Sequence, residues 1–337
     1  MKYSVIVPVY NRPDEVRELL ESLLRTGFKD FETVLVEDGS TVRCDAVVAD
    51  YSDRMDVKYF MKENGGPGPA RNLGAEKAKG QILLILDSDV IVPEGYFKAI
   101  EEELSIKDSD AFGGPDRAHE SFTAVQKAIN YSMTSFFTTG GIRGGKKKLD
   151  KFYPRSFNMG IKKGVFKSLG GFSKMRFGED IDLSIRIFEG GHSCRLFPGA
   201  WVYHKRRTDF RKFFKQVHNS GIARINLYKK YPSSLKLVHL LPAAFTVGTV
   251  LLLLISLFWP WAFAPIFLYA LAILVDSFAK NSLEGTGITQ SLKIALLSIW
   301  ASFVQLFGYG TGFIRAWWNR CVMGRGEMEA FKKNFYK

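Results

Sequence analysis

Cysteine is scarce in this chain, which has three cysteines among 337 residues. Cys44, Cys194 and Cys321 lie far apart and have neither the spacing of a metal site nor that of a disulfide framework. Their scatter predicts a main domain in a reducing cytoplasm. A secretory signal is also lacking, because Met1–Tyr10 is predicted to be the first strand of a folded domain.

Motifs of RNA-binding and DNA-binding proteins are absent too, although the formal net charge of +13 indicates an anionic partner. Nucleic acid, anionic lipid headgroups and phosphorylated substrates are the three candidates. The basic residues gather just before and after the apolar segments, which favours a membrane surface. We therefore expect membrane lipids among the partners and no nucleic acid.

The first two thirds of the chain contain alternating strand and helix patterns. Tyr3–Tyr10 is rich in β-branched residues, as expected of a buried parallel strand, and a helix face follows Pro13. Such repeats predict an α/β fold with a Rossmann-like, mostly parallel sheet flanked by helices. The further predicted strands are 33–36, 57–60 and 82–86, and the further predicted helices are 44–51 and 69–79.

Ligands of such sheets bind at the carboxyl ends of the strands, which places Pro8–Arg12, Glu37–Ser40 and Asp87–Asp89 on one rim. After about Asp108 the pattern is mixed. Asn158–Gly160 is compatible with a simple turn and with the border of a sugar pocket. The mixed region predicts strands at 110–114, 193–197 and 201–204, helices at 122–137 and 179–189, and a basic loop at 143–148.

Apolar segments dominate the last third of the chain. Leu237–Trp259 is long enough to span a membrane, and Trp261–Val275 is long enough if it extends toward Phe278. Together they predict a transmembrane hairpin with the tryptophans beside Pro260 at the far interface. A third run, Leu292–Ile314, precedes a basic tail, and basic tails usually stay cytoplasmic. Either this run is re-entrant or interfacial, which we favour slightly, or it is a full span and the tail violates the charge rule.

A helix predicted over Thr208–Tyr231 carries phenylalanines on one side and basic residues nearby. It suits the headgroup layer of a membrane and equally suits packing of its phenylalanine face against protein. The predicted domains are therefore a catalytic domain over residues 1–207, an interfacial helix region over 208–234, and a membrane region with its basic tail over 235–337.

Two acidic clusters carry the chemistry that we expect. Asp87-Ser88-Asp89 follows a strand, and two carboxylates spaced in this way can share a hard divalent cation that bridges phosphate oxygens, although the triplet alone also fits a turn. Glu179-Asp180 opens a helix, where carboxylates also serve as helix caps. Its functional interpretation is that one carboxylate takes a proton from an attacking hydroxyl.

Five motifs occur in order: Val5–Arg12, Val36–Ser40, Gly68–Gly74, Asp87–Asp89 and Gly178–Asp182. Together they resemble the inverting family 2 glycosyltransferases of the GT-A fold, over roughly the first two thirds of the chain. The resemblance implies transfer of a sugar from a nucleoside-diphosphate donor, with UDP favoured by family habit. It also implies Mn²⁺ or Mg²⁺ as the cofactor, which neutralises the departing diphosphate.

The resemblance also implies roles for single residues. Pro8, Tyr10 and Arg12 would line the nucleotide site, Asp38 would bond the base, and Arg71 would lie near base or diphosphate. The remaining roles are Asp87 at the ribose or a metal-bound water, Ser88 in the nucleotide-sugar site, Asp89 as the metal ligand, Asp180 as the catalytic base and Glu179 as the residue that orients donor or acceptor. Some related transferases place a histidine where His204 stands, as a further metal or diphosphate ligand; a histidine bonded to a backbone carbonyl is the alternative.

Departures from the family pattern narrow the activity. Processive members carry a Gln-x-x-Arg-Trp element, whereas here Gln216–Ser220 lacks the Arg-Trp pair, which predicts transfer of one sugar to a lipid-linked glycan of the cell surface. The main alternative is a polyprenyl-phosphate glycosyl synthase, which needs no hydroxyl base. A catalytically inactive membrane scaffold is the second alternative. The expected location is the plasma membrane, with the catalytic domain on its cytoplasmic side.

Overall fold

The computed structural model describes residues 1–119, 121–139, 152–175 and 177–327. The chain divides into two compact units. The α/β unit comprises residues 1–119 and the described part of 150–205, and the helical unit comprises the described part of 120–149 together with 206–327. The basic loop at 143–148 and the end of the basic tail lie outside the described residues.

Seven strands form the main sheet of the α/β unit, in the order β3-β2-β1-β4-β8-β6-β9. The four strands β1 to β4 are parallel to one another, and β8 is antiparallel to β4 and to β6. The α/β fold with a mostly parallel sheet is therefore confirmed. The strands are β1 (Tyr3–Val9), β2 (Phe31–Asp38), β3 (Val57–Lys62), β4 (Ile82–Leu86), β6 (Ala111–Gly113), β8 (Asn158–Lys162) and β9 (Cys194–Leu196).

Asn158–Gly160 forms the first part of β8, so the alternative of a simple turn is wrong. The backbone of Gly160 passes so close to the ring of Phe112 that a Cβ at this position would lie 2.1 Å from a ring carbon. A short strand with a glycine at its centre has a weak sequence pattern, and its position depends on β4 and β6 on either side.

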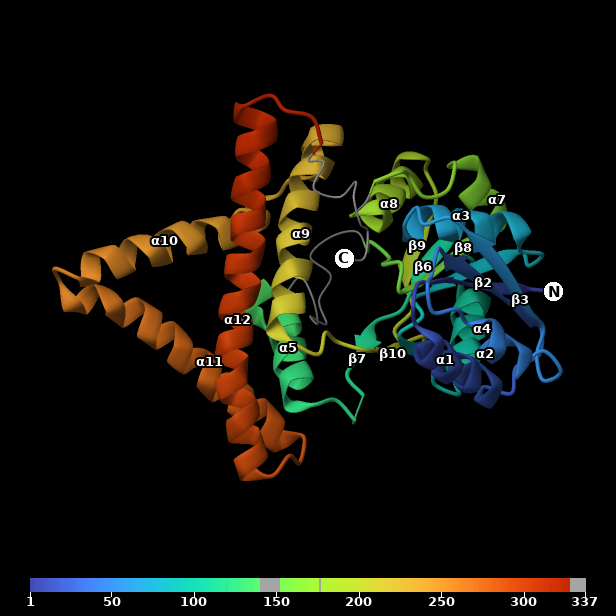
Figure 1. The fold of residues 1–337 in the computed structure, drawn as a ribbon, viewed down its shortest axis with the longest axis horizontal. Coiled ribbons are helices and arrows are strands. Elements are labelled where there is room, and N and C mark those ends of the chain that lie inside the picture. Colours follow the sequence, from blue (N-terminus) through green and yellow to red (C-terminus); the bar gives the residue numbers. More distant parts are fainter. Residues whose placement is uncertain (120, 140–151, 176, 328–337) are drawn as a thin grey trace. The chain divides into compact units, whose positions relative to one another are not determined.

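Helices cover both faces of this sheet (Figure 1). One face carries α1 (Pro13–Arg25), α2 (Asp45–Ala49) and α4 (Tyr96–Ile106), and the other carries α3 (Pro67–Lys77), α7 (Lys163–Ser168) and α8 (Glu179–Glu189). Helix α1 begins at Pro13, whose fixed φ suits a first helical turn, and it buries its leucines against the sheet. Burial of these apolar side chains is the main stabilising contribution to the unit.

A second sheet of three short strands completes the α/β unit. It has the order β5 (Val90–Ile91), β10 (Val202–His204), β7 (Asp116–Arg117). The antiparallel pairing of β10 with β5 sets His204 opposite Val90, next to the aspartates that follow β4. Pairing between strands, and not nearness in the chain, brings this histidine to the acidic cluster.

The helical unit is built around a long helix, α12 (Ile288–Trp317), which packs against α5 (Ala124–Thr134) and α9 (Phe210–Lys230). Phe213 and Val217 of α9 are buried in a cluster with Ile129 of α5 and residues of α12. These two side chains therefore pack against protein and do not face the headgroup layer of a membrane, which was the other alternative. Because α5 contributes to this core, it belongs to the helical unit, although we expected residues 1–207 to form one domain.

Glycines allow α9 and α12 to approach closely along parallel axes (Figure 1). A Cβ on Gly308 would lie 2.4 Å from a methyl carbon of Val217, and a Cβ on Gly312 would lie 2.0 Å from the carbonyl oxygen of His218. Gly221 of α9 meets the backbone of Tyr309 in the same way. The spacing Gly308-x-x-x-Gly312 is a signal for such packing that the sequence analysis missed.

The apolar runs fold differently from the expectation in two respects. The first run forms a helix of only 16 residues, α10 (Leu241–Ser256), because Pro242 lies in its first turn and 3-10 turns precede it. The third run forms the unbroken 30-residue α12, so it does not turn back on itself, and the interfacial alternative stays a prediction. By length and composition, two segments could cross a membrane, Pro260–Leu283 and Ile288–Val322. The first of them contains α11 (Ala264–Leu283).

Candidate functional site

The rim predicted from the sequence forms at the carboxyl ends of β1, β2 and β4. Val9 is in register with Glu37 across β1 and β2, and β4 pairs in parallel on the other side of β1. Residues that follow these strands therefore emerge at the same edge of the sheet, as expected for parallel strands. Pro8 and Ser88 are buried at this edge, while the side chain of Tyr10 is partly exposed.

Asp87, Asp89 and His204 form a group that can hold a metal ion. Each offers one ligand atom, and these atoms lie within 4.8 Å of one another. Asp89 Oδ1 lies 3.3 Å from His204 Nε2, and both Asp89 Oδ1 and His204 Nδ1 are buried without a hydrogen-bond partner. Two carboxylates and one imidazole suit a divalent cation such as Mn²⁺, and the unpartnered Asp89 oxygen fits a ligand role.

Positive charge already lies beside Asp89. Arg12 Nη1 is 2.5 Å from Asp89 Oδ2, so the arginine predicted for the nucleotide site is paired with the predicted metal ligand. Burial alone would raise the pKa of Asp89, but His204 and Arg12 outweigh it and hold this pKa well below its usual range. Asp89 is therefore ionised at neutral pH, as a metal ligand must be.

Arg71 joins the two acidic clusters. This side chain of α3 is 4% exposed; its Nη2 donates to Asp87 Oδ1 at 2.7 Å and its Nη1 donates to Glu179 Oε1 at 2.9 Å. Carboxylates that are 92 positions apart in sequence (179 minus 87) thus bind the two ends of one guanidinium. The acidic clusters lie together, as the glycosyltransferase interpretation requires.

Glu179 and Asp180 open α8, directly after Gly178, whose φ of 84° is a left-handed conformation that favours glycine. Arg155 Nε donates to Asp180 Oδ2 at 2.6 Å, and the backbone N–H of Ile181 donates to Asp180 Oδ1 at 2.8 Å. Sequence reasoning missed Arg155, because no motif marks an arginine that pairs with a residue 25 positions away.

The two neighbouring carboxylates differ in acidity. Burial and the charge of Asp180 raise the pKa of Glu179 to about 7, and Arg71 only partly offsets them. For Asp180, burial is outweighed by Arg155 and by the Ile181 N–H, which lower its pKa. Two carboxyl groups with different protonation at one site can divide acid and base roles between them.

Asp38 is fully buried at the end of β2. Its carboxylate accepts hydrogen bonds from Lys62 Nζ at 2.8 Å, from the Gly65 N–H at 2.9 Å and from the Gly66 N–H at 2.7 Å. These contacts hold the loop that leads into α3. The predicted hydrogen bond from Asp38 to a nucleobase stays a prediction, and it would compete with three contacts within the protein.

Two surface hollows in the described part of the α/β unit lie away from this cluster. One lies beside α1 and Tyr51, and another lies beside Ile82 and Lys162. None of the predicted site residues lines either hollow. We therefore base the site on the converging side chains and not on surface shape.

Comparison with known sequences gives related proteins for this chain. Residues 4–170 match the family model described as glycosyl transferase family 2. A stretch of 137 residues is 34% identical to an uncharacterized glycosyltransferase of Rickettsia felis, covering 41% of this chain and 22% of that protein. A stretch of 211 residues is 26% identical to the minor teichoic acid biosynthesis protein GgaB of Bacillus subtilis, covering 61% of this chain and 23% of that protein. The matched region is thus less than a quarter of either relative.

Two solved structures resemble nearly the whole chain. Mannosyltransferase PcManGT from Pyrobaculum calidifontis, in complex with GDP-Man and Mn²⁺, aligns over 95% of this chain and 88% of its own, with a TM-score of 0.58 and 16% identity. Staphylococcus aureus TarS 1–349 in complex with UDP-GlcNAc aligns over 97% of this chain and 93% of its own, with a TM-score of 0.50 and 18% identity. At these identities the likeness shows a shared fold.

Proposed function

Because residues 4–170 form a glycosyl transferase family 2 domain and the fold is of the GT-A type, we propose that the chain transfers one sugar from a nucleoside-diphosphate donor, with inversion, to a lipid-linked glycan at a membrane. The observation that carries the proposal is the Arg71 bridge between Asp87 and Glu179. It gathers cation ligands and a carboxylate pair into one site, which a single displacement at the anomeric carbon requires.

Each side chain of the site has a distinct part in this proposal. Asp87, Asp89 and His204 would hold Mn²⁺ or Mg²⁺, which supplies charge neutralisation for the diphosphate leaving group. Asp180, ionised and held by Arg155, takes the proton from the acceptor hydroxyl as the new glycosidic bond forms. Glu179, held by Arg71, orients donor or acceptor. No covalent enzyme intermediate is needed, because the hydroxyl itself is the nucleophile.

A UDP-sugar is the donor that we favour. TarS, whose fold this chain shares, was solved with UDP-GlcNAc, whereas PcManGT was solved with GDP-Man. Pro8, Tyr10, Arg12, Asp38, Arg71 and Ser88 remain the proposed contacts to the nucleotide-sugar.

A membrane acceptor agrees with the exposed apolar helices of the helical unit, and the named role of GgaB in teichoic acid synthesis agrees with a cell-surface polymer. We place the catalytic domain on the cytoplasmic face of the plasma membrane, where nucleotide-sugars are available and the thiols stay reduced.

The first experiment identifies the donor. The full chain in detergent is mixed with Mn²⁺ and, in turn, with UDP-GlcNAc, UDP-glucose and GDP-mannose, and its melting temperature is measured. A donor at one hundred times its Kd stabilises the native state by about 2.7 kcal/mol, which raises the melting temperature. No shift with any nucleotide-sugar over a wide concentration range would contradict the proposal.

The second experiment identifies the product. The donor found in the screen is radiolabelled and incubated with bacterial membrane lipids, and the lipid products are hydrolysed under mild acid. We expect the acid to release the label from its lipid carrier as part of an oligosaccharide and not as a single sugar. A sugar monophosphate-lipid would instead indicate a polyprenyl-phosphate glycosyl synthase, and unlabelled lipids in every condition would favour the inactive scaffold.

A further inference from the structure

Helices α10 and α11 form a hairpin, residues 241–283, whose distal half is apolar and exposed. The side chains of Phe258 and Trp261 are 91% and 74% exposed, and exposed leucines precede them on α10. The sequence has no Asp, Glu, Lys or Arg between Lys236 and Asp276. An exposed apolar surface of this composition marks a contact with a membrane or with another protein.

The turn between the two helices, which we call the hairpin tip (residues 257–263), makes several of its backbone hydrogen bonds internally. The N–H groups of Leu257, Phe258 and Trp259 donate to carbonyls of the last turn of α10. Pro260 has no N–H, and the N–H of Ala262 donates to Trp259. A tip in water does not need internal hydrogen bonds, because water can take their place. A tip in hydrocarbon needs them, because each unsatisfied backbone group there costs several kcal/mol.

Helix α12 crosses the base of the hairpin instead of running beside it. Pro242 of α10 and Ser277 of α11 stand at a similar distance from the tip. Pro242 lies 14 residues before the end of α10 (256 minus 242), and Ser277 lies 13 residues after the start of α11 (277 minus 264). Yet Pro242 meets Gly310, and Ser277 Oγ bonds Ser298 Oγ at 2.9 Å. Ser298 and Gly310 are twelve positions apart on α12, which corresponds to about 18 Å along the helix axis at 1.5 Å per residue.

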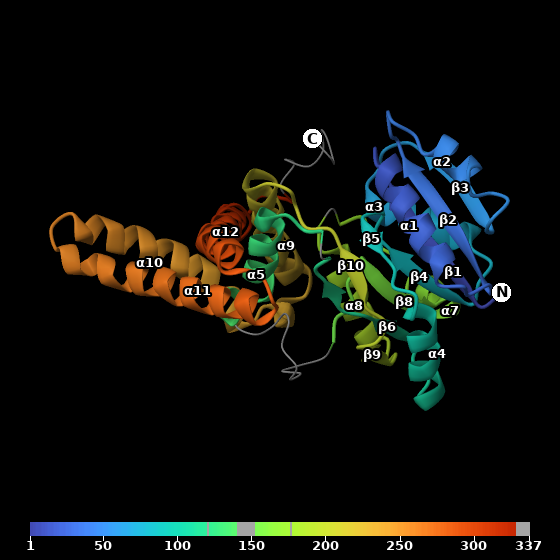
Figure 2. The same ribbon diagram turned by 90° about the horizontal axis from the view of Figure 1, so that it is seen from below.

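The views agree with this crossing. In Figure 2, α12 is seen close to end-on while α10 and α11 extend sideways from it as a pair. A hairpin that stands along the membrane normal therefore sets α12 roughly along the membrane plane. Length and composition alone would have allowed α12 to span.

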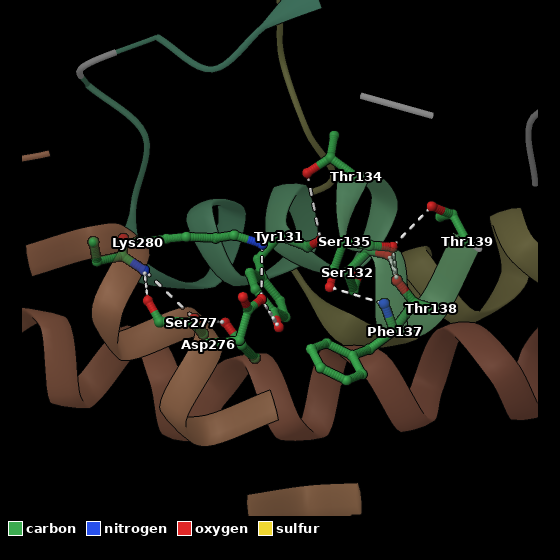
Figure 3. A network of polar contacts seen from close by, with 12 residues as sticks. Tyr131, Ser132, Thr134, Ser135, Phe137, Thr138, Thr139, Asp276, Ser277 and Lys280 are labelled. Atoms are coloured by element: carbon green, nitrogen blue, oxygen red, sulfur yellow. Dashed lines mark hydrogen bonds and ion pairs between the residues drawn. The ribbon is translucent and has the colours of Figure 1, made fainter. Parts of the chain in front are cut away.

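Charged groups gather at the base of the hairpin and not at its tip. Tyr131 of α5 donates to Asp276 Oδ2 at 2.6 Å, and Lys280 Nζ lies 2.7 Å from the same oxygen (Figure 3). Lys293 and Arg315 stand near the two ends of α12. This arrangement suits a hairpin that inserts from one side of a bilayer, because the apolar tip enters the hydrocarbon while the charged groups stay at the headgroups.

We propose that the hairpin inserts into one leaflet of a phospholipid bilayer, with its tip in the hydrocarbon and with α12 along the surface. The α10 helix, at 16 residues or about 24 Å, is shorter than the ~30 Å hydrocarbon core, and its first half is occupied by packing on α12. Both ends of the hairpin then lie on the side of the basic residues. The inference rests on the proposed function only for the attachment to a membrane. It differs from the sequence prediction, which placed Trp259 and Trp261 at the far interface of the membrane.

Depth measurements along α10 test the inference without reference to catalysis. Nitroxide labels are attached in the full chain, in a background with Cys44→Ala, Cys194→Ser and Cys321→Ser, reconstituted into vesicles of phosphatidylcholine and phosphatidylglycerol. The labelled positions are Val247, Leu251, Leu254 and Phe258, all exposed, with Ser220 of α9 as the control. Collision rates with oxygen and with a nickel chelate report depth.

We expect the ratio of oxygen to nickel collisions to rise steadily from Val247 to Phe258, while the Ser220 label stays accessible to nickel. A ratio that peaks at Leu251 and falls at Phe258 would show a spanning hairpin and overturn the inference. Low collision rates with both reagents at the tip would show contact with a second copy of the chain, and nickel access at every position would show no insertion. The last two results also overturn it.

A charge placed at the tip gives a second measurement that needs no label. Phe258→Lys puts an ammonium group where we place hydrocarbon, whereas Leu237→Lys changes a side chain that is 83% exposed before α10 begins. The ratio of bound to free protein in vesicle flotation should fall about 100-fold for Phe258→Lys and little for Leu237→Lys. Equal behaviour of the two variants would contradict an embedded tip. Loss of sugar transfer has no part in either test, so a failure here is separable from a failure of the proposed function.

Discussion

The two units of this chain differ in the residues that they expose and in the contacts between their helices. The α/β unit buries leucine, valine and phenylalanine, and its buried charged groups have ion-pair or hydrogen-bond partners, as Arg71 has in Asp87 and Glu179. In the helical unit, the contacts between helices include many small or polar residues, while leucine, phenylalanine and tryptophan stand exposed. The buried small residues of α12 are Ser291, Ala295, Ser298, Ala301, Ser302, Gly308, Gly310, Gly312 and Ala316.

This difference agrees with the membrane environment that we propose for the hairpin. In water, burial of apolar area is the main driving force, so large apolar side chains lie inside. In lipid that force between helices is lost, and close packing of small residues with hydrogen bonds between helices takes its place. The serine bond from Ser277 to Ser298 and the glycine contacts of α9 with α12 are of this second kind. Four substitutions test the contrast, from the largest expected effect to the smallest.

The largest effect is expected from Asp89→Ala, which changes function and leaves the fold. Removal of the ionised ligand leaves the diphosphate charge uncompensated, so transfer should become undetectable, as it should when EDTA is added to the wild type. The rate of sugar transfer is measured with and without added Mn²⁺. Glu94→Ala, an exposed carboxylate of the same unit, is the control and should keep full activity. Full wild-type activity in EDTA would contradict the metal assignment.

Asp180→Asn is expected to lower the transfer rate by about 100- to 10,000-fold, the usual contribution of a positioned general base. Asparagine keeps one acceptor oxygen, for the bond from Arg155 or for the bond from the Ile181 N–H, which go to different oxygens of Asp180. Since the size of the side chain is unchanged, folding and donor binding should persist. The transfer rate and the donor-induced rise in melting temperature are measured together. Asp53→Asn, at an exposed position, is the control. Unchanged transfer by Asp180→Asn would remove the assignment of the base.

Gly312→Leu should destabilise the helical unit by about 3 kcal/mol, because a side chain there meets the backbone of His218. Thermal unfolding in detergent measures the loss. Gly248→Leu on α10 is the matched control, since nothing lies within 4 Å of a Cβ at that position. If both variants melt alike, close glycine packing does not stabilise this unit.

The smallest effect concerns pH and Glu179. Its pKa is raised from an ordinary value of 4.5 to about 7, so between these values the native state holds a proton that the unfolded state has lost. Stability therefore falls as pH rises through this window, by roughly 1 to 3 kcal/mol. Glu179→Gln cannot ionise and should lose this dependence. The melting temperature of the variant relative to that of the wild type should therefore rise from pH 5 to pH 8. A constant difference between the two would contradict the shift. Glu94→Gln is the control.

The sequence by itself determined the α/β fold and the family. Strands rich in β-branched residues alternate with helices, and five short motifs follow in order. Both patterns are local and can be found without knowledge of the fold, because they depend on backbone periodicity and on residues that follow strand ends. Most predicted strands and helices agree with the structure within a few residues. The patterns failed for β8 and for the short strands β5 and β7, which exist because of their neighbours.

Only the tertiary structure decided which charges meet. Arg12 on Asp89, Arg71 between Asp87 and Glu179, and Arg155 on Asp180 all join residues that are far apart in the chain, so no spacing in the sequence predicts them. The same holds for the hairpin. Composition identifies an apolar segment and its length, but the angle at which α12 crosses the base of α10 and α11 depends on which small residues face one another, and this is a property of packed helices in three dimensions.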